Sequence, residues 1–162
     1  MTAHDHEHAA GRPHSADGRA LTALAVSATA HCLTGCAIGE VLGMVIGTAL
    51  EWSNGATIVL AVALAFFFGY LLTITPVLKA GVSLRQAVGI ALAADTVSIA
   101  VMEVTDNGIM LLVPGAMQAG LANLLFWASL AASLALAFVV TVPVNRWLIS
   151  RGRGHAVVHS YH

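Results

Sequence analysis

Sulfur and carboxylate side chains recur at every fourth position of one apolar segment, as Cys32, Cys36, Glu40 and Met44. In an α-helix this spacing places the four side chains along one face. Sulfur ligands select soft ions such as Cu(I), and a carboxylate widens the choice to zinc and other divalent ions. The pattern predicts a metal-binding face. The competing interpretation is that the thiols and the thioether are ordinary core residues.

Glycines form a second row beside the first, because His31 is followed at every fourth position by Gly35, Gly39, Gly43 and Gly47. Small residues let another helix backbone approach closely in lipid, where helix association depends on packing. The four glycines therefore predict a helix-packing groove, through which copies of this chain or a partner helix could associate. His31, at the start of the row, is a candidate metal ligand.

A third group of polar side chains lies further along the chain, at the spacings of three, four and seven that mark one broad helical face: Asp95, Ser98, Met102, Glu103, Asp106, Asn107 and Met110. No Lys or Arg lies between residues 20 and 78 or between residues 86 and 145 to neutralise the acids. Protons or a bound cation must then supply the missing positive charge. The alternative is that Glu103 and Asp106 lie close enough to the membrane surface to be solvated.

The composition identifies the environment of these residues. The chain of 162 residues is 58% apolar or aromatic and only 9% charged, with a mean hydropathy of +0.84. Soluble domains carry about 25% charged residues, so an integral membrane protein is indicated. A disordered chain, a nucleic-acid-binding module and an ordinary globular enzyme are excluded. We predict an all-α polytopic fold with a transmembrane domain at 20–149, whose four spans cover about 28–52, 56–78, 86–113 and 121–149.

The seven Lys and Arg residues occupy only three places: before residue 20, in the loop 79–85, and from residue 146 onward. Cytoplasmic loops carry the excess of Lys and Arg, which predicts that both termini are cytoplasmic. Asn145 and Arg146 are then expected to act as anchors at the membrane surface.

Seven of the eight histidines lie in the two polar ends of the chain, a predicted disordered tail at 1–19 and a basic tail at 150–162, and six of them are candidates for metal capture: His4, His6, His8, His155, His159 and His162. Imidazoles that alternate with carboxylates in a flexible segment bind copper or divalent ions weakly and exchangeably. We predict that the tails capture metal and pass it to the membrane site. The alternative is that they are merely solvated polar tails.

Four spans that alternate in direction make the first and third spans parallel. Aligning their cytoplasmic ends places residue n of the first span beside residue n+58 of the third. Cys36 is then expected at the depth of Asp95, Glu40 at that of Ser98, and Met44 at that of Met102. The two polar faces are predicted to meet and to enclose a shared site.

Three stretches of the sequence, HCLTGCAIGEVLGMVIG, ALAADTVSIAVMEVTDN and PVNRWLISRGRGHAVVH, resemble a bacterial four-helix inner-membrane family, domain-of-unknown-function family 4396. The resemblance covers about residues 28–160. It implies the four-helix architecture and a location in the bacterial cytoplasmic membrane, but it implies no mechanism, because the family has no established activity.

These patterns together predict a small membrane protein that binds or transports a metal ion, with copper favoured and zinc as the second choice. The expected ligands are His31, Cys32, Cys36, Glu40, Met44, Asp95, Met102, Glu103 and Asp106. The expected partners are the lipid bilayer, a protein that donates or accepts the metal, and further copies of the chain in a homo-oligomer. A nucleic-acid partner is not expected.

The main alternative is a non-catalytic scaffold or assembly factor that docks a partner helix in the glycine groove. An enzyme is not expected. A bis-His haem would need a second histidine within the membrane, and Asp95 and Asp106 lie about 16 Å apart along one helix, which argues against a protease dyad. A redox role for the two thiols stays open.

Overall fold

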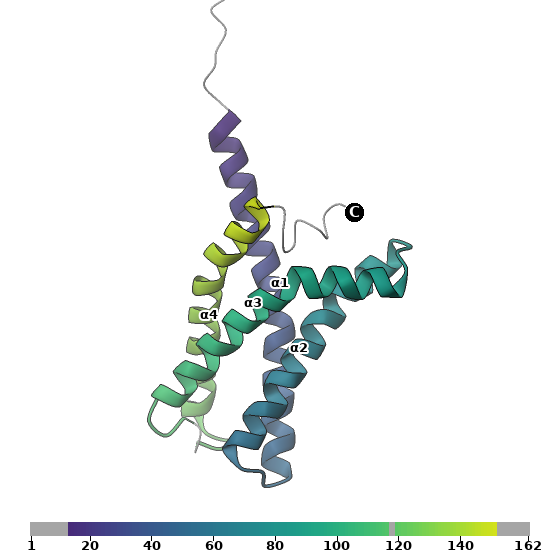
Figure 1. Ribbon diagram of the computed structural model, residues 1–162. Helices are drawn as coiled ribbons and strands as arrows, with labels where there is room; N and C mark the ends of the chain where they lie inside the picture. Colours follow the sequence, from purple (N-terminus) through teal and green to yellow (C-terminus); the bar gives the residue numbers. More distant parts are fainter. Residues whose placement is uncertain (1–12, 117–118, 152–162) are drawn as a thin grey trace, which may run out of the picture.

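The computed structural model describes residues 13–116 and 119–151, and every regular element in this part of the chain is an α-helix (Figure 1). The four helices are α1 (Pro13–Ala49), α2 (Asn54–Lys79), α3 (Leu84–Leu112) and α4 (Leu124–Ser150). All four are long enough and apolar enough to cross a membrane, α1 through its stretch Gly18–Ala49. The prediction of an all-α protein with four potential spans is confirmed.

The ends of α2, α3 and α4 lie within three residues of the predicted span boundaries, whereas α1 differs more. It starts at Pro13, inside the segment predicted to be a disordered tail, and ends at Ala49 instead of residue 52. Proline suits the first helical turn, because its missing N–H would have no partner there in any helix. The six tail histidines proposed to capture metal lie outside the described residues.

Short connections turn the chain back on itself between the helices. Ser53 caps α2 by accepting a hydrogen bond from the N–H of Ala56 (3.4 Å), and Asn123 caps α4 by accepting one from Leu125 (2.9 Å). Gly81, with a φ of 85°, makes the turn after α2 in a backbone conformation that other residues rarely adopt. The connections 50–53 and 80–83 are short, and the chain reverses its direction at each of them (Figure 1).

The helix α1 packs against each of the other three helices and most extensively against α2. Figure 1 shows α3 crossing α1 obliquely, and it shows the start of α1 and the end of α4 at the same end of the molecule. This arrangement leaves one face of α1 for α2 and another for α3 and α4.

The glycine row of α1 is the face that α2 covers. A Cβ atom added to Gly35 would lie 2.6 Å from the Cα of Gly69, and one added to Gly39 would lie 2.5 Å from the Cα of Ala65. Gly43 and Gly47 lie in the same way against Ala61 and Thr57 of α2. The small residues of α2 therefore also recur at every fourth position, and the two helices lie in close contact along about three helical turns.

This contact corrects the expectation that the groove is open to another chain. The helix α2 of the same chain fills it, so a partner helix or a second copy could enter the groove only by displacing α2. The scaffold interpretation and the homo-oligomer through the glycine face both need a free groove.

Candidate functional site

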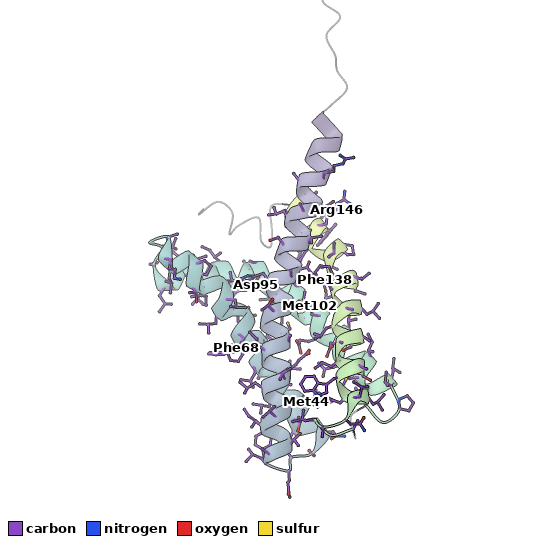
Figure 2. The ribbon with its side chains drawn as sticks, turned by 180° about the vertical axis from the view of Figure 1, so that it is seen from behind. Met44, Phe68, Asp95, Met102, Phe138 and Arg146 are labelled. Atoms are coloured by element: carbon purple, nitrogen blue, oxygen red, sulfur yellow. The ribbon has the colours of Figure 1, made fainter. Side chains whose placement is uncertain are left out.

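The polar faces of α1 and α3 meet inside the bundle at successive levels. The thiol of Cys32 donates a hydrogen bond to Oδ1 of Asp95 (3.5 Å). One turn further along α1, Sγ of Cys36 lies 4.0 Å from Sδ of Met102. Figure 2 shows Asp95, Met102 and Met44 following one another along the bundle. The sulfur and carboxylate row of α1 therefore faces the acidic helix over several turns.

The register between the two helices differs from the expected one. Paired residues are 63 positions apart at Cys32 and Asp95 and 66 positions apart at Cys36 and Met102, instead of about 58. Cys36 is thus not the neighbour of Asp95 that the alignment predicted. The alignment assumed that both spans begin at one level, but α1 begins well before residue 28 and α3 crosses it obliquely (Figure 1).

All four acids of this interface are buried. The exposed fraction is 0% for Asp95, 4% for Glu40, 5% for Glu103 and 3% for Asp106. The alternative that Glu103 and Asp106 are solvated at the membrane surface is therefore wrong. Burying a carboxylate among apolar helices is costly unless it is hydrogen-bonded, protonated or bound to a cation.

Asn145 of α4 joins three helices at the level of Asp95. Its side-chain N–H donates to Oγ1 of Thr29 (2.8 Å), and its Oδ1 accepts from the hydroxyl of Ser98. The neighbouring pair, Thr73 of α2 and Nε2 of His31, is 3.2 Å apart. The expectation that Asn145 is a surface anchor is wrong, because its side chain is only 1% exposed. Arg146, the other expected anchor, is exposed.

The sequence of α4 carries a signal for this network. Polar or small residues recur on α4 at every fourth position, as Ser129, Ser133, Ala137, Thr141 and Asn145, and all five are buried. Ser and Thr are common in membrane helices, so the spacing alone does not distinguish this row from scattered small residues. Two members of the row form hydrogen bonds to other helices: Ser133 to Asp106 of α3, and Asn145 to Thr29 of α1 and Ser98 of α3.

We predict that Asn145→Leu destabilises the bundle by about 1 to 2 kcal/mol, because it leaves the hydroxyls of Thr29 and Ser98 without their bridging partner. Unfolding of the purified protein in mixed detergent micelles measures the change. Ser150→Ala, at the exposed end of α4, is the control and should stay within about 0.5 kcal/mol of the parent protein. An unchanged stability in Asn145→Leu would show that the network is not structural.

Further along α3, the carboxyls of Glu103 and Asp106 each accept a hydrogen bond from a neighbouring side chain. Asp106 accepts a hydrogen bond from the hydroxyl of Ser133. The Oε2 atom of Glu103 accepts one from Asn107 (3.3 Å), while its Oε1 atom is buried without a partner among the described residues. The Glu103 carboxyl lies next to the thiol of Cys36. Glu103 therefore retains an oxygen that could bind a further group.

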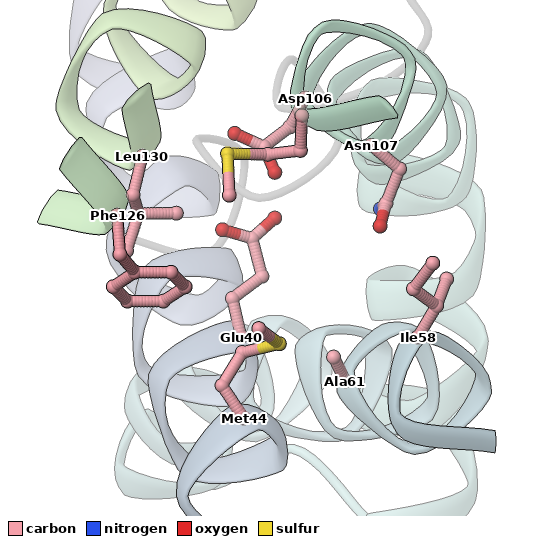
Figure 3. A pocket seen from close by; sticks show the side chains of 9 residues that line it. Glu40, Met44, Ile58, Ala61, Asp106, Asn107, Phe126 and Leu130 are labelled. Carbon is pink, nitrogen blue, oxygen red and sulfur yellow. The ribbon is translucent and has the colours of Figure 1, made fainter. Parts of the chain in front are cut away.

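Glu40 is the least satisfied of the acids. Both of its carboxyl oxygens are buried, and neither has a hydrogen-bond partner in the described part of the chain. Figure 3 shows this carboxyl pointing away from α1 toward the carboxyl of Asp106 on α3. Two carboxylates cannot face each other in an apolar interior unless a proton or a cation lies between them.

A cavity of about 20 Å³ lies beside this pair of carboxyls. That volume holds one water-sized particle. Its walls come from all four helices: Glu40, Met44, Ile58, Ala61, Asp106, Asn107, Met110, Phe126 and Leu130. The donors that line it are the two carboxylates, the amide oxygen of Asn107 and the thioethers of Met44 and Met110, so hard and soft ligands lie side by side.

The predicted ligands divide into three groups instead of forming one site. Cys32 and Asp95 form one contact, with His31 nearby on Thr73; Cys36, Met102 and Glu103 form the second group; Glu40, Met44 and Asp106 form the third. Within residues 13–116 and 119–151, no three His, Cys, Asp or Glu side chains are arranged to hold a metal ion together. A metal site with three or more protein ligands in this region therefore needs a donor of another kind, such as methionine sulfur or an amide oxygen.

Comparison with other proteins gives the family but no activity. No curated protein and no solved structure matches the chain. A family model matches residues 23–154, which include all of α2, α3 and α4 and most of α1. The chain belongs to the family described as Domain of unknown function (DUF4396).

Proposed function

We propose that this protein binds a metal ion inside its membrane-spanning bundle, at the cavity that Glu40 and Asp106 line, and that it serves metal handling at a bacterial cytoplasmic membrane. Copper is the favoured ion, and zinc is the second choice. One observation carries the proposal: the buried carboxyl of Glu40 has no hydrogen-bond partner among the described residues and faces a second carboxyl, that of Asp106, beside a cavity for one particle.

The charge balance of the site supports a cation. The side chains around the cavity include two acids and no Lys, Arg or His. The nearest Lys or Arg positions in the sequence lie outside residues 86–145 and 20–78. A cation held between Glu40 and Asp106 would compensate their charges, whereas no side chain lining the cavity can do so.

The sulfur atoms at the cavity support copper over a hard ion. Met44 of α1 and Met110 of α3 both line the cavity. Thioethers bind Cu(I) and contribute little to sites for magnesium or calcium. A cavity for one particle also leaves no room for the water shell that magnesium usually keeps.

A proton shared by Glu40 and Asp106 is the competing occupant, and it would make the pair a proton site without metal. The test that separates the two uses a tail-substituted chain, which is the full-length protein with alanine at six positions: His4, His6, His8, His155, His159 and His162. Purified in detergent, this chain is titrated with Cu(I) under anaerobic conditions, and separately with Zn(II).

We predict that Glu40→Gln in the tail-substituted chain lowers the Cu(I) stoichiometry by one ion per chain, or weakens one site at least about tenfold, because the amide carries no charge. Equilibrium competition with a Cu(I)-binding dye measures both values. The matched control is Glu51→Gln, since Glu51 is exposed in the turn before α2. Equal binding by the parent chain and by Glu40→Gln would overturn the assignment of the ion to this cavity.

A further inference from the structure

The thiol of Cys36 and the thioether of Met102 face each other between α1 and α3, with 4.0 Å between Sγ and Sδ. Both side chains are fully buried, at 0% and 1% exposure. Metal–sulfur bonds are about 2.3 Å long. Two such bonds span 4.0 Å when the angle between them is about 120°, so an ion bound to both sulfurs needs no movement of the helices.

A third donor is already present at this place. The carboxyl of Glu103 lies next to the Cys36 thiol, and its buried Oε1 atom has no hydrogen-bond partner in the described structure. Asn107 holds the other oxygen, Oε2, at 3.3 Å. This hydrogen bond orients the carboxyl and leaves Oε1 available.

We propose that Cys36, Met102 and Glu103 form a second metal station, a three-coordinate site for a monovalent soft ion, Cu(I) or Ag(I). The proposal deepens the proposed function and rests on it only in requiring that a metal ion enters the bundle. On binding, the metal–sulfur bond at Cys36 replaces the S–H bond, and the proton leaves to the solution.

The coordination number selects the ion. Zinc takes four ligands in structural sites, and magnesium and calcium take six or more oxygens. The station offers three ligands, two sulfurs and one oxygen, which is fewer than these ions take. Cu(I), in contrast, prefers the thiolate and thioether ligands that are present. The station therefore discriminates against divalent ions by ligand type and by ligand count.

The station lies one helical turn from the cavity on both helices that form it. Cys36 precedes Glu40 by four residues on α1, and Met102 precedes Asp106 by four residues on α3. Four residues rise about 6 Å along a helix. An ion could move between the two sites in one short step, with sulfur and carboxylate ligands at each end.

X-ray absorption at the copper edge tests the station directly. The tail-substituted chain with Cys32→Ser, so that Cys36 is its one thiol, is loaded anaerobically with half an equivalent of Cu(I). The thiolate is the strongest donor, so this amount fills the station first. We expect two sulfur ligands at about 2.3 Å and one oxygen or nitrogen ligand.

Met102→Leu keeps the size of the side chain and should reduce the sulfur count from two to one. Ile99→Leu, in the same buried cluster, is the matched control and should keep two sulfurs. The proposed site is wrong if copper has a single sulfur ligand in the parent chain, or if it keeps two sulfur ligands in Met102→Leu. The proposed function fails separately, when Glu40→Gln binds as much Cu(I) as its parent.

Discussion

Gly39→Leu is expected to prevent the bundle from assembling. A Cβ atom at Gly39 would lie 2.5 Å from both the Cα of Ala65 and the carbonyl carbon of Leu64, which are backbone atoms of α2. Real Cβ atoms do not approach so closely, and a backbone cannot rotate away as a side chain can. The two helices must therefore separate, and the contact is lost along the whole glycine row.

We expect a loss of at least about 3 kcal/mol in unfolding free energy, or no recoverable folded protein. Size-exclusion chromatography and detergent unfolding provide the measurements. The control is Gly89→Leu: Gly89 also lies within a helix, but a Cβ atom there would meet nothing within 4 Å. That variant should stay within about 0.5 kcal/mol of the parent protein.

The same pair of variants tests the scaffold interpretation. If the glycine groove docked a partner helix, Gly39→Leu would fold normally and lose only the partner. Because α2 of the same chain fills the groove, we expect the folded state itself to be lost. A stable and monodisperse Gly39→Leu protein would mean that the contact between α1 and α2 differs from the one described.

Hydropathy and spacing were sufficient to predict the four helices and the chemically important face of α1. Apolar segments of this length form helices in a membrane, because the backbone N–H and C=O groups find no water in lipid and must hydrogen-bond within the segment. A spacing of four residues places Cys32, Cys36 and Glu40 on one face, whichever neighbours the helix has. These predictions depend only on local geometry, so they did not require knowledge of the packing.

The pairing of the helices could not be derived from local patterns. The offset between Cys36 and Met102 depends on where α1 begins and on how steeply α3 crosses it, and both result from packing. The partner of the glycine groove was equally undetermined, since a small-residue row fits any close helix. The hydrogen bonds of Asn145 were missed because a polar residue near a span end also fits the membrane surface.

Glu40→Lys is expected to abolish metal binding at the cavity while the protein stays folded. The ammonium group of lysine would lie close to the carboxyl of Asp106, which already accepts a hydrogen bond from Ser133. It would supply, as part of the chain, the positive charge that we assign to the metal ion. Without metal, the variant should unfold no more easily than the parent protein, because a carboxyl pair is replaced by an ion pair.

Two measurements on the tail-substituted chain check this expectation: the Cu(I) stoichiometry, which should fall by one ion per chain, and the unfolding midpoint in detergent without metal. The double variant Glu40→Lys/Asp106→Lys is the control for charge, since two buried ammonium groups repel each other. It should lose about 3 kcal/mol or more. A Glu40→Lys protein that binds Cu(I) as the parent does would show that the ion does not lie between these two side chains. A protein that unfolds like the double variant would show that Asp106 is not within reach of residue 40. Because the first result concerns the ion and the second concerns the geometry, the two failures can be told apart.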